Sequence, residues 1–465
     1  MYALRLWSVR HARAWWRVYR AMARLAPLLR PLVRVFGAER MQRVLAPVER
    51  QLKGLFFDCR MCGQCVLSAT GMACPMNCPK QMRNGPCGGV RANGHCEVEP
   101  RMRCVWVEAR QGQQRIAAGR NPAVTSALPA LDRRQQGRST WVEVVHGRVE
   151  PLQQPALPER VVAASQASAL ERACREGRFV FSVEVAPPDS ANPQDLLARA
   201  AHFKDLADAI NITDGAGGHC HMSSVAASAI LVAHGYEPVY QIACRDRNRI
   251  AIQGDLIGAA ALGVKNILCL TGDDVSQGDH PEAKPVFDLD AVSLLHTVRG
   301  MCDHARYASG RTLSTPPDFF IGASANPFVP PHLDRLDNLE KKVRAGARFI
   351  QTQFCFDLDA MQRFMQAVRA RGLHQQAHIL VGVGTLNNAR ALQWMAQHVP
   401  GVHIPANIIE RVGAASDPRL QGQRVCLDII RRLRDIEGVA GVHVMGHKNE
   451  TTLAEIIARA REHTN

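Results

Sequence analysis

Short apolar runs alternate with longer amphipathic stretches from residue 178 to the end of the chain. The runs are FVFSVEV, AINIT, EPVYQIA, VKNILCL, FFIGASA, ARFIQTQF, HILVGV and GVHVM. The stretches between them place apolar residues three and four apart, as in LDNLEKKVRAGA and DLDAMQRFMQAVRARG, which indicates helices. Eight such runs alternating with helices predict a parallel α/β fold. Eight is also the strand number of a closed (β/α)8 TIM barrel, which we expect over residues 171–465.

A doubly wound open sheet is the alternative arrangement of the same runs. The first run is not followed by the G-x-G-x-x-G pattern of dinucleotide-binding sheets, which favours the barrel. Ahead of the barrel, EPLQQPALPER predicts a linker over residues 151–170, because three prolines fall in a short polar run. RSTWVEVVHGRV, just before this linker, predicts a short strand pair.

Residues 4–26 predict a basic amphipathic helix within an N-terminal segment of residues 1–54. One stripe of this helix carries Arg10, Arg13, Arg17, Arg20 and Arg24. The opposite side carries Leu4, Trp15, Tyr19 and Met22. Two interpretations stay open: a helix that contacts a membrane surface or a partner, and a helix packed on its own protein with a solvated arginine face.

The positive charge is concentrated in this N-terminal segment. The chain has 57 Lys+Arg and 42 Asp+Glu, a formal net charge of +15. Residues 1–53 hold twelve Lys+Arg and two acids, an excess of 12 − 2 = +10, so the other 412 residues carry only +5. A nucleic-acid face needs a basic patch on a folded domain, so we expect no nucleic-acid partner.

Eight of the fifteen cysteines lie within residues 55–150, which predict a loop-rich domain of their own. These eight are Cys59, Cys62, Cys65, Cys74, Cys78, Cys87, Cys96 and Cys104. The sequence shows neither a secretory signal nor a transmembrane run, so we expect a cytoplasmic protein whose clustered cysteines are ligands rather than disulfides. The other seven cysteines are scattered singly and are expected to be small buried hydrophobic residues.

The C-x2-C-x2-C spacing that starts at Cys59 is typical of a metal or cluster site, because adjacent thiolates on a tight loop reach one centre. Eight thiols are enough for two four-cysteine centres. We favour iron–sulfur clusters for these centres. Structural zinc is the alternative, since four-cysteine zinc sites stabilise small loop-rich domains.

Polar residues, with one glycine, lie in or just after six of the eight apolar runs, near the C-terminal strand ends where barrels form active sites. They are Glu184, Thr213, Asp214, Gln241, Thr271, Gly272, Asp273, Asn326 and Gln353. Each one alone is more often a helix N-cap than a functional residue. A ring drawn from six strands is more specific. Two of its carboxylates, Glu184 and Asp273, lie on different strands and can divide into a proton donor and a charged partner.

At these residues the chain resembles the methylenetetrahydrofolate reductases. The motifs are FSVEVAPP, ITDGAGG, CRDRN, ILCLTGDD, NLEKKVRAGARFIQTQFCFD and GVHVMGH, in family order over residues 178–463. The resemblance implies a flavin barrel that reduces 5,10-methylenetetrahydrofolate to 5-methyltetrahydrofolate. It implies Glu184 as general acid and Asp273 as the aspartate beside flavin and pterin, with Gln353 orienting the folate.

The resemblance also implies a set of cofactor-binding residues for FAD or FMN. They are Thr213, Gln241, Thr271, Gly272, Asp273, Ala323, Asn326 and Lys342. The lysine suits a flavin phosphate. Gln241, Thr271 and Asn326 depart from the best-known bacterial pattern. The CRDRN and NPF forms look more like the branch found in acetogens and related prokaryotes. The electron donor is then NAD(P)H or a redox protein.

The cysteine region is similar to the small cysteine-rich partner subunit of that branch, here fused in front of the barrel. The resemblance implies electron delivery through this domain to the flavin, which is our reason for favouring iron–sulfur clusters over zinc. We also expect a homo-oligomer. Two other functions stay open. One is a barrel acting on another folate or methyl substrate, and the other is a zinc-stabilised basic binding module attached to an inactive barrel.

Overall fold

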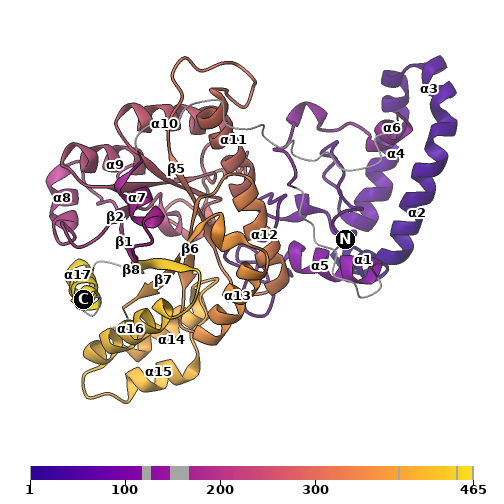
Figure 1. Ribbon diagram of the computed structural model, residues 1–465. Coiled ribbons are helices and arrows are strands. Elements are labelled where there is room, and N and C mark those ends of the chain that lie inside the picture. The colour runs from indigo at the N-terminus through magenta and orange to yellow at the C-terminus, as the bar shows by residue number, and fades with distance from the viewer. Residues whose placement is uncertain (1, 118–126, 147–166, 386–387, 447–448, 463–465) are drawn as a thin grey trace. The chain divides into compact units, whose positions relative to one another are not determined.

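The computed structural model describes residues 2–117, 127–146, 167–385, 388–446 and 449–462 (Figure 1). The chain divides into two compact units. The N-terminal unit comprises residues 1–87 and 93–156, and the barrel unit comprises residues 88–92 and 157–465. The linker expected at residues 151–170 lies largely outside the described residues.

Eight parallel strands close the barrel in sequence order, and β8 pairs with β1. This confirms the predicted (β/α)8 fold and all eight predicted strands. The strands are β1 (Val180–Val185), β2 (Ala209–Ile212), β3 (Pro238–Ala243), β4 (Asn266–Leu270), β5 (Phe320–Ala325), β6 (Phe349–Phe354), β7 (His378–Gly384) and β8 (Val439–Met445).

Helices surround the barrel, and side chains cap the N-termini of several of them. Asn248 accepts from the first turn of α10, and Asp290 forms a capping box with Ser293 at α11. The helices are α7 (Ala169–Arg175), α8 (Pro193–Ala201), α9 (Ser224–Ala233), α10 (Arg249–Ala261), α11 (Ala291–His304), α12 (His332–Arg344), α13 (Leu358–Ala370), α14 (Ala389–His398), α15 (Ala406–Gly413), α16 (Pro418–Arg434) and α17 (Glu450–Glu462).

Helix α7 closes the N-terminal end of the barrel. Its Leu170, Ala173 and Cys174 are buried in one cluster with the first inward side chains of the strands, including Val180 and Phe349. Because side chains alternate along a strand, the residues two and four positions later also point inward, toward the other end. The inward side chains that a ligand can reach therefore lie at the C-terminal ends of the strands.

The N-terminal unit is built from helices around an irregular region. The helices are α1 (Tyr2–Arg10), α2 (Ala12–Leu25), α3 (Arg30–Phe36), α4 (Ala38–Phe57), α5 (Val105–Ile116) and α6 (Thr140–Val145). The helix predicted over residues 4–26 is thus two helices, α1 and α2, that meet at His11. Helix α4 runs through the boundary expected between residues 54 and 55. Between residues 58 and 104 the only helical element is a 3-10 turn, Pro75–Asn77.

The strand pair predicted from RSTWVEVVHGRV is wrong in the described residues, because Thr140–Val145 form helix α6. The cause is a distant carboxylate. Glu49 of α4 accepts from the Ser139 hydroxyl at 2.5 Å and from the Trp141 backbone N–H at 3.2 Å. A negative charge at a helix N-terminus stabilises the helix, and local sequence does not reveal it.

No helix among the described residues is long and apolar enough to cross a membrane. The scattered cysteines are buried as predicted, with the exception of the exposed Cys220.

Candidate functional site

Glu184 lies near the C-terminal end of β1 and faces the barrel interior. Its Oε2 atom is 3.8 Å from Nε2 of His443 on β8. The glutamate side chain is 29% exposed, whereas the histidine side chain is 3% exposed. The predicted general acid therefore combines access to a ligand with a fixed, buried neighbour.

A buried hydrogen-bond network lies beneath Glu184 and orients this neighbour. The Nδ1 atom of His443 is 3.0 Å from the Ser182 hydroxyl, which also accepts from the Gln351 side chain at 3.2 Å. Gln351 and Asn211 exchange hydrogen bonds of 2.6 and 3.0 Å. Four strands thus contribute to one polar layer inside the barrel, and each of these side chains is buried.

His443 was not among the predicted site residues, although the run GVHVM contains it. The signal was available: residues 441, 443 and 445 share the inward face of β8 by period-two alternation. A histidine at an inward position of a barrel strand is a polar group that must find a partner. Its partner, Glu184, comes from a strand more than 250 residues earlier, so spacing alone could not pair them.

Asp273 follows β4, and the glycine loop after β2 holds its carboxylate. Its Oδ2 atom accepts a hydrogen bond of 2.8 Å from the backbone N–H of Gly217 in the run after β2. The side chain is exposed. The neighbouring Asp214 is a structural residue, because its carboxylate binds Arg247 at 2.7 Å and the Ala243 backbone N–H at 2.8 Å.

Gln353 lies at a β-bulge near the end of β6. The pairing with β7 shifts between Gln351 and Phe354, so β6 carries one extra residue there. The Thr352 hydroxyl fills the ladder position by accepting from the Gly382 N–H at 2.9 Å. Bulges redirect side chains and are common beside active sites. The predicted folate-orienting glutamine is therefore at a position where the strand departs from regular geometry.

Two of the predicted flavin-binding residues have features that suit a ligand. Thr213 is buried, and its hydroxyl has no hydrogen-bond partner among the described residues. Leaving such a group unsatisfied costs about 1–3 kcal/mol, so a polar ligand atom at this point would be stabilising. Gln241 is buried on the inward face of β3, in the same layer as the network below Glu184.

Gly272, another predicted flavin-binding residue, lies where two strand ends approach closely. It has a φ of 95°, and a Cβ atom there would lie 2.8 Å from Cβ of Arg245 and 3.1 Å from Cβ of Ala243. The glycine is therefore required by the packing of the chain after β4 against the chain after β3.

The other four predicted flavin-binding residues are engaged within the barrel unit. Thr271 accepts from the Ala291 N–H at 3.2 Å, and the Lys342 ammonium donates to the Ser324 carbonyl at 2.6 Å. The Asn326 amide donates to the carbonyls of Gly88 and Gly401 at 2.8 Å each and accepts from Phe328. Ala323 is fully buried in β5. Both amide N–H groups of Asn326 are therefore in use, so a ligand acceptor at Asn326 would have to replace one of these two bonds.

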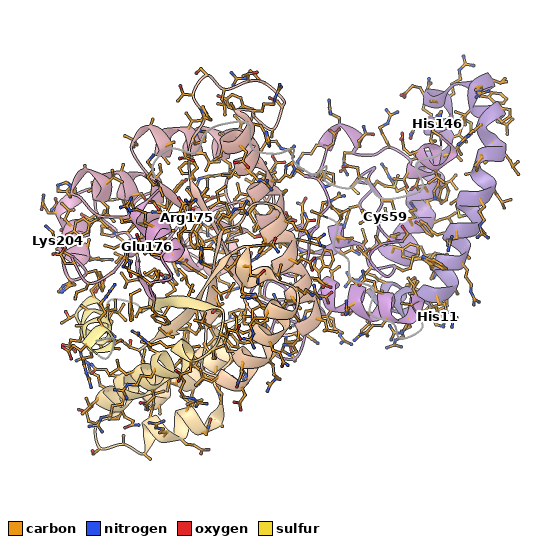
Figure 2. The ribbon with its side chains drawn as sticks, viewed as in Figure 1. His11, Cys59, His146, Arg175, Glu176 and Lys204 are labelled. Carbon is orange, nitrogen blue, oxygen red and sulfur yellow. The ribbon has the colours of Figure 1, made fainter. Side chains whose placement is uncertain are left out.

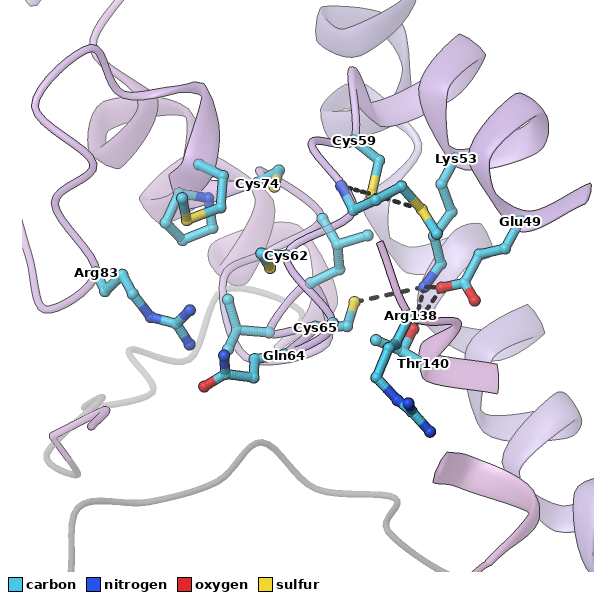
Figure 3. Close-up of a pocket in the computed structure, with 16 residues that line it drawn as sticks. Glu49, Lys53, Cys59, Cys62, Gln64, Cys65, Cys74, Arg83, Arg138 and Thr140 are labelled. Atoms are coloured by element: carbon cyan, nitrogen blue, oxygen red, sulfur yellow. Dashed lines mark hydrogen bonds and ion pairs between the residues drawn. The ribbon is translucent and has the colours of Figure 1, made fainter. Parts of the chain in front are cut away.

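The first four cysteines of the N-terminal unit surround one cavity. Cys59, Cys62, Cys65 and Cys74 all line it, and Figure 3 shows them around the same space with Arg83 at one side and Lys53 at the other. Burial raises the pKa of Cys74, and Cys59, Cys62 and Cys65 nearby raise it further. We call these four residues the first cysteine set.

The last four cysteines influence one another in the same way and form the second cysteine set. Burial, with Cys104 and Cys96 nearby, raises the pKa of Cys78 to about 12. Burial and then Glu97 raise the pKa of Cys87, to which Cys104 and Cys78 add. A buried ion pair accompanies this set, Lys80 Nζ to Glu97 Oε1 at 2.5 Å.

All eight thiols are free, and as placed no three His, Cys, Asp or Glu side chains of the described residues could hold a metal ion. Thiols are good metal ligands, and in the first cysteine set four of them line one cavity. Gly63, inside the C-x2-C-x2-C loop, is pressed against the chain at Gln135, where a Cβ atom would lie 2.2 Å from a carbonyl oxygen. The loop is therefore held close to its surroundings at that point.

Lys53 is a buried cation beside the first cysteine set, and sequence reasoning missed it. Its ammonium is 2.5 Å from Glu49 Oε1, 2.8 Å from the Thr140 hydroxyl and 3.7 Å from Cys65 Sγ (Figure 3). The Tyr19 hydroxyl is 3.8 Å from the same sulfur. Two hydrogen-bonding groups thus converge on Cys65, which is the arrangement that tunes sulfur ligands in metal centres.

The closed (β/α)8 barrel and the paired polar residues at its strand ends define a barrel enzyme. The family described as methylenetetrahydrofolate reductase matches residues 169–461, and the chain belongs to this family, which makes it an oxidoreductase. A second family, described as methylene-tetrahydrofolate reductase C terminal, matches residues 38–130 of the N-terminal unit.

Individual relatives agree with this assignment at low identity. The 5,10-methylenetetrahydrofolate reductase of Pectobacterium carotovorum subsp. carotovorum is 26% identical over 295 residues, which cover 60% of this chain and 90% of that one. The Escherichia coli (strain K12) enzyme of that name is 25% identical with the same coverage. The probable methylenetetrahydrofolate reductase (NADPH) of Caenorhabditis elegans is 23% identical over 304 residues. The match covers 62% of this chain and 43% of the longer Caenorhabditis elegans protein.

Proposed function

We propose that the barrel reduces 5,10-methylenetetrahydrofolate to 5-methyltetrahydrofolate with a bound flavin, either FAD or FMN. Family membership and the names of the bacterial relatives support the reaction. The observation that carries the proposal is the Glu184–His443 pair at the C-terminal end of the barrel, with its buried support. The unpartnered Thr213 hydroxyl supports a polar ligand on the same end.

In this proposal the residues of the chain bind the folate and handle a proton. Glu184 donates a proton to a folate nitrogen, so that the ring through the bridging methylene opens to a cationic iminium. The carboxylate of Asp273 stabilises this cation by its charge. Gln353, directed by the β6 bulge, hydrogen-bonds the pterin. The flavin, when bound, supplies the hydride that the methylene carbon accepts.

His443 acts on this chemistry through Glu184. It is buried and held by Ser182, so it presents one ring nitrogen to the carboxyl group in a fixed direction. At 3.8 Å the pair is not hydrogen-bonded as placed, and a small approach of the carboxyl group toward this fixed partner would orient the acid and reduce the cost of ordering it in the transition state. We therefore assign His443 as a positioning residue for the proton donor.

For the N-terminal unit we propose two iron–sulfur clusters, one in each cysteine set, with structural zinc as the alternative. The separation of the eight thiols into two sets of four supports two centres. The thiols would have to turn toward a common point to bind, because as placed they do not form a metal site. The buried Lys53 ammonium favours a centre with net negative charge, as a four-thiolate cluster has. We further propose that these clusters deliver electrons from NAD(P)H or a redox protein.

The whole protein, purified without oxygen, provides the test of both proposals. We expect flavin absorption bands, a broad cluster shoulder, iron and sulfide in the sample, and oxidation of 5-methyltetrahydrofolate by an artificial acceptor. Absence of flavin together with absence of this oxidation contradicts the barrel proposal. Zinc in place of iron contradicts only the cluster proposal. Turnover of the methyl substrate without turnover of the methylene substrate favours the alternative barrel function.

Replacing Lys53 is expected to lower the reduction potential of the centre in the first cysteine set. Lys53→Met removes a positive charge 3.7 Å from Cys65 Sγ, and the reduced cluster, which is more negative, loses more stabilisation than the oxidised one. A redox titration followed by absorbance and electron paramagnetic resonance measures the shift.

The matched control for this variant is Lys80→Met, which removes a buried cation beside the second cysteine set. It should move the potential of the other centre. Lys53→Met also leaves Glu49 buried and uncompensated, so Lys53→Met/Glu49→Gln restores neutrality and should show a smaller shift of the same sign. An unchanged potential in both Lys53 variants means that Lys53 does not tune the centre.

A further inference from the structure

The N-terminal helices expose most of the apolar side chains that this protein shows to its surroundings. Among the described residues, twenty large hydrophobic side chains are exposed, and fifteen of them lie between residues 2 and 55. Large exposed apolar patches on a folded protein mark contacts with a partner or a membrane. None of these fifteen side chains belongs to the residues proposed for the barrel chemistry.

The most exposed of these side chains gather where the chain reverses between α2 and α4. We define the apolar tip as the exposed side chains of Leu25, Leu28, Leu29, Leu32, Val35, Phe36 and Val44. They come from the end of α2, the 3-10 turn Ala26–Leu29, helix α3 and the start of α4. Gly37, with a φ of 78°, makes the reversal. Figure 1 shows α3 at the end of the N-terminal unit.

The apolar tip is a folded structure with buried anchors on its inner side. Ala26 and Val33 are buried in one cluster with Val145 of α6. The Arg30 guanidinium donates to the Val145 carbonyl at 2.9 Å. The inner face of the tip therefore packs against α6 and holds the segment in place. Its outer face still exposes apolar side chains. An outer face of this kind is not explained by the packing of the unit itself.

Exposed arginines outnumber acids in the segment that forms the apolar tip, although Asp132 and Glu143 line the neighbouring groove. Five exposed arginines belong to this region: Arg24, Arg30, Arg34, Arg40 and Arg43. The one acid between residues 2 and 48 is Glu39, which pairs with Arg138 at 2.9 Å. The region thus combines large exposed apolar side chains with a strong positive charge.

We propose that the apolar tip inserts into the interface of a lipid bilayer that contains anionic lipids. Apolar side chains that enter the headgroup boundary, with basic side chains around them, bind through burial and electrostatic attraction together. Charge complementarity selects this occupant over a second copy of the chain, because two copies would bring the same arginines together. Residues 1–53 carry an excess of +10.

A protein helix in the neighbouring groove is the competing occupant. Leu25, Leu28 and Leu29 also line this groove, together with Val144 and Val145. A helix seated there would leave Leu32, Val35, Phe36 and Val44 uncovered, because these residues lie outside the groove. Val35, at 79% exposure, is the most exposed of them. A bilayer surface covers the whole tip, which is why the structure favours it.

Flotation of the full-length protein with vesicles provides the test, and it requires neither flavin activity nor a known partner. The probes are vesicles of phosphatidylcholine with phosphatidylglycerol in equal parts, and vesicles of phosphatidylcholine alone. We expect binding to the anionic vesicles and at least about tenfold weaker binding to the neutral ones. Leu28→Ser/Val35→Ser should weaken binding to anionic vesicles by at least about tenfold, because two inserted side chains are lost.

Two controls keep this test interpretable. Ile250→Ser/Trp394→Ser changes similarly exposed side chains of the barrel unit and should bind like the wild type. Circular dichroism during heating shows whether each variant is folded. The proposal is overturned if the wild type does not float with anionic vesicles, or if the tip variant floats equally well. A concentration-dependent dimer that the tip variant abolishes, without vesicle binding, assigns the tip to a second copy instead.

Discussion

The variant Glu184→Gln is expected to reduce 5,10-methylenetetrahydrofolate about 10²–10⁴-fold more slowly than the wild type, the range for loss of a general acid. Glutamine keeps the size and the contact with His443 but has no proton to give to the folate nitrogen. Flavin content and reduction of the flavin by its donor should stay close to wild type. Rapid-mixing measurements of the two half-reactions separate these outcomes, because the defect is confined to the folate half.

Two further variants make this prediction specific. Glu176→Gln is the control. It removes the carboxylate at the end of α7, before β1 (Figure 2), and both half-reactions should keep their wild-type rates. His443→Asn should lower the folate half-reaction by a smaller factor, about tenfold, because the acid remains but loses its fixed partner. A Glu184→Gln enzyme with a wild-type folate half-reaction would falsify the assignment of the proton donor.

Substituting one cysteine in each set is expected to remove one metal centre and leave the other. Cys62→Ser should lower metal content by about half, as should Cys96→Ser, and the double variant should lose nearly all of it. Each loss should lower the free energy of unfolding of the N-terminal unit by more than about 3 kcal/mol. A metal that binds only the folded chain adds its binding free energy to the stability of the fold. Residues 58–104 contain little regular structure that could compensate.

Metal analysis, electron paramagnetic resonance and thermal unfolding of the full chain measure these effects. Cys220→Ser is the control, because Cys220 is the exposed cysteine outside both sets and should change none of them. Complete loss of metal in either single variant contradicts two independent centres. Retention of full metal content in both single variants contradicts the assignment of the cysteine sets.

The barrel could be predicted from the sequence because its pattern is local and repeated. Each strand is a short apolar run, and each run matched a strand of the structure. Glu184 and Gln353 could be placed for the same reason, since they end such runs. His443 could not be assigned a role, because its importance comes from a contact between β8 and β1. Closing a barrel brings together residues that sequence spacing keeps apart.

The N-terminal unit was less predictable because distant contacts determine its local structure. Helix α6 depends on the carboxylate of Glu49, about 90 residues earlier, and the sequence of α6 alone favoured strands. Cysteine spacing predicted enough thiols for two centres, but it did not reveal which thiols share a centre. It also gave no sign of Lys53, whose contact with Cys65 requires α4 to lie beside the cysteine loop.

A segment after α5 covers the cysteine loop, which matters for the assembly of the metal centre proposed for the first cysteine set. The Gly137 N–H donates to the Met61 carbonyl at 2.8 Å, and the Gln136 side chain donates to the Arg60 carbonyl at 2.8 Å, so this segment lies over the cysteine loop. The ribosome makes all eight cysteines before it makes residues 136–141, and chains fold progressively from their N-terminus. The nascent chain therefore presents the cysteine loop before the covering segment exists, and we expect the proposed centre to be loaded more readily during synthesis than in the finished protein.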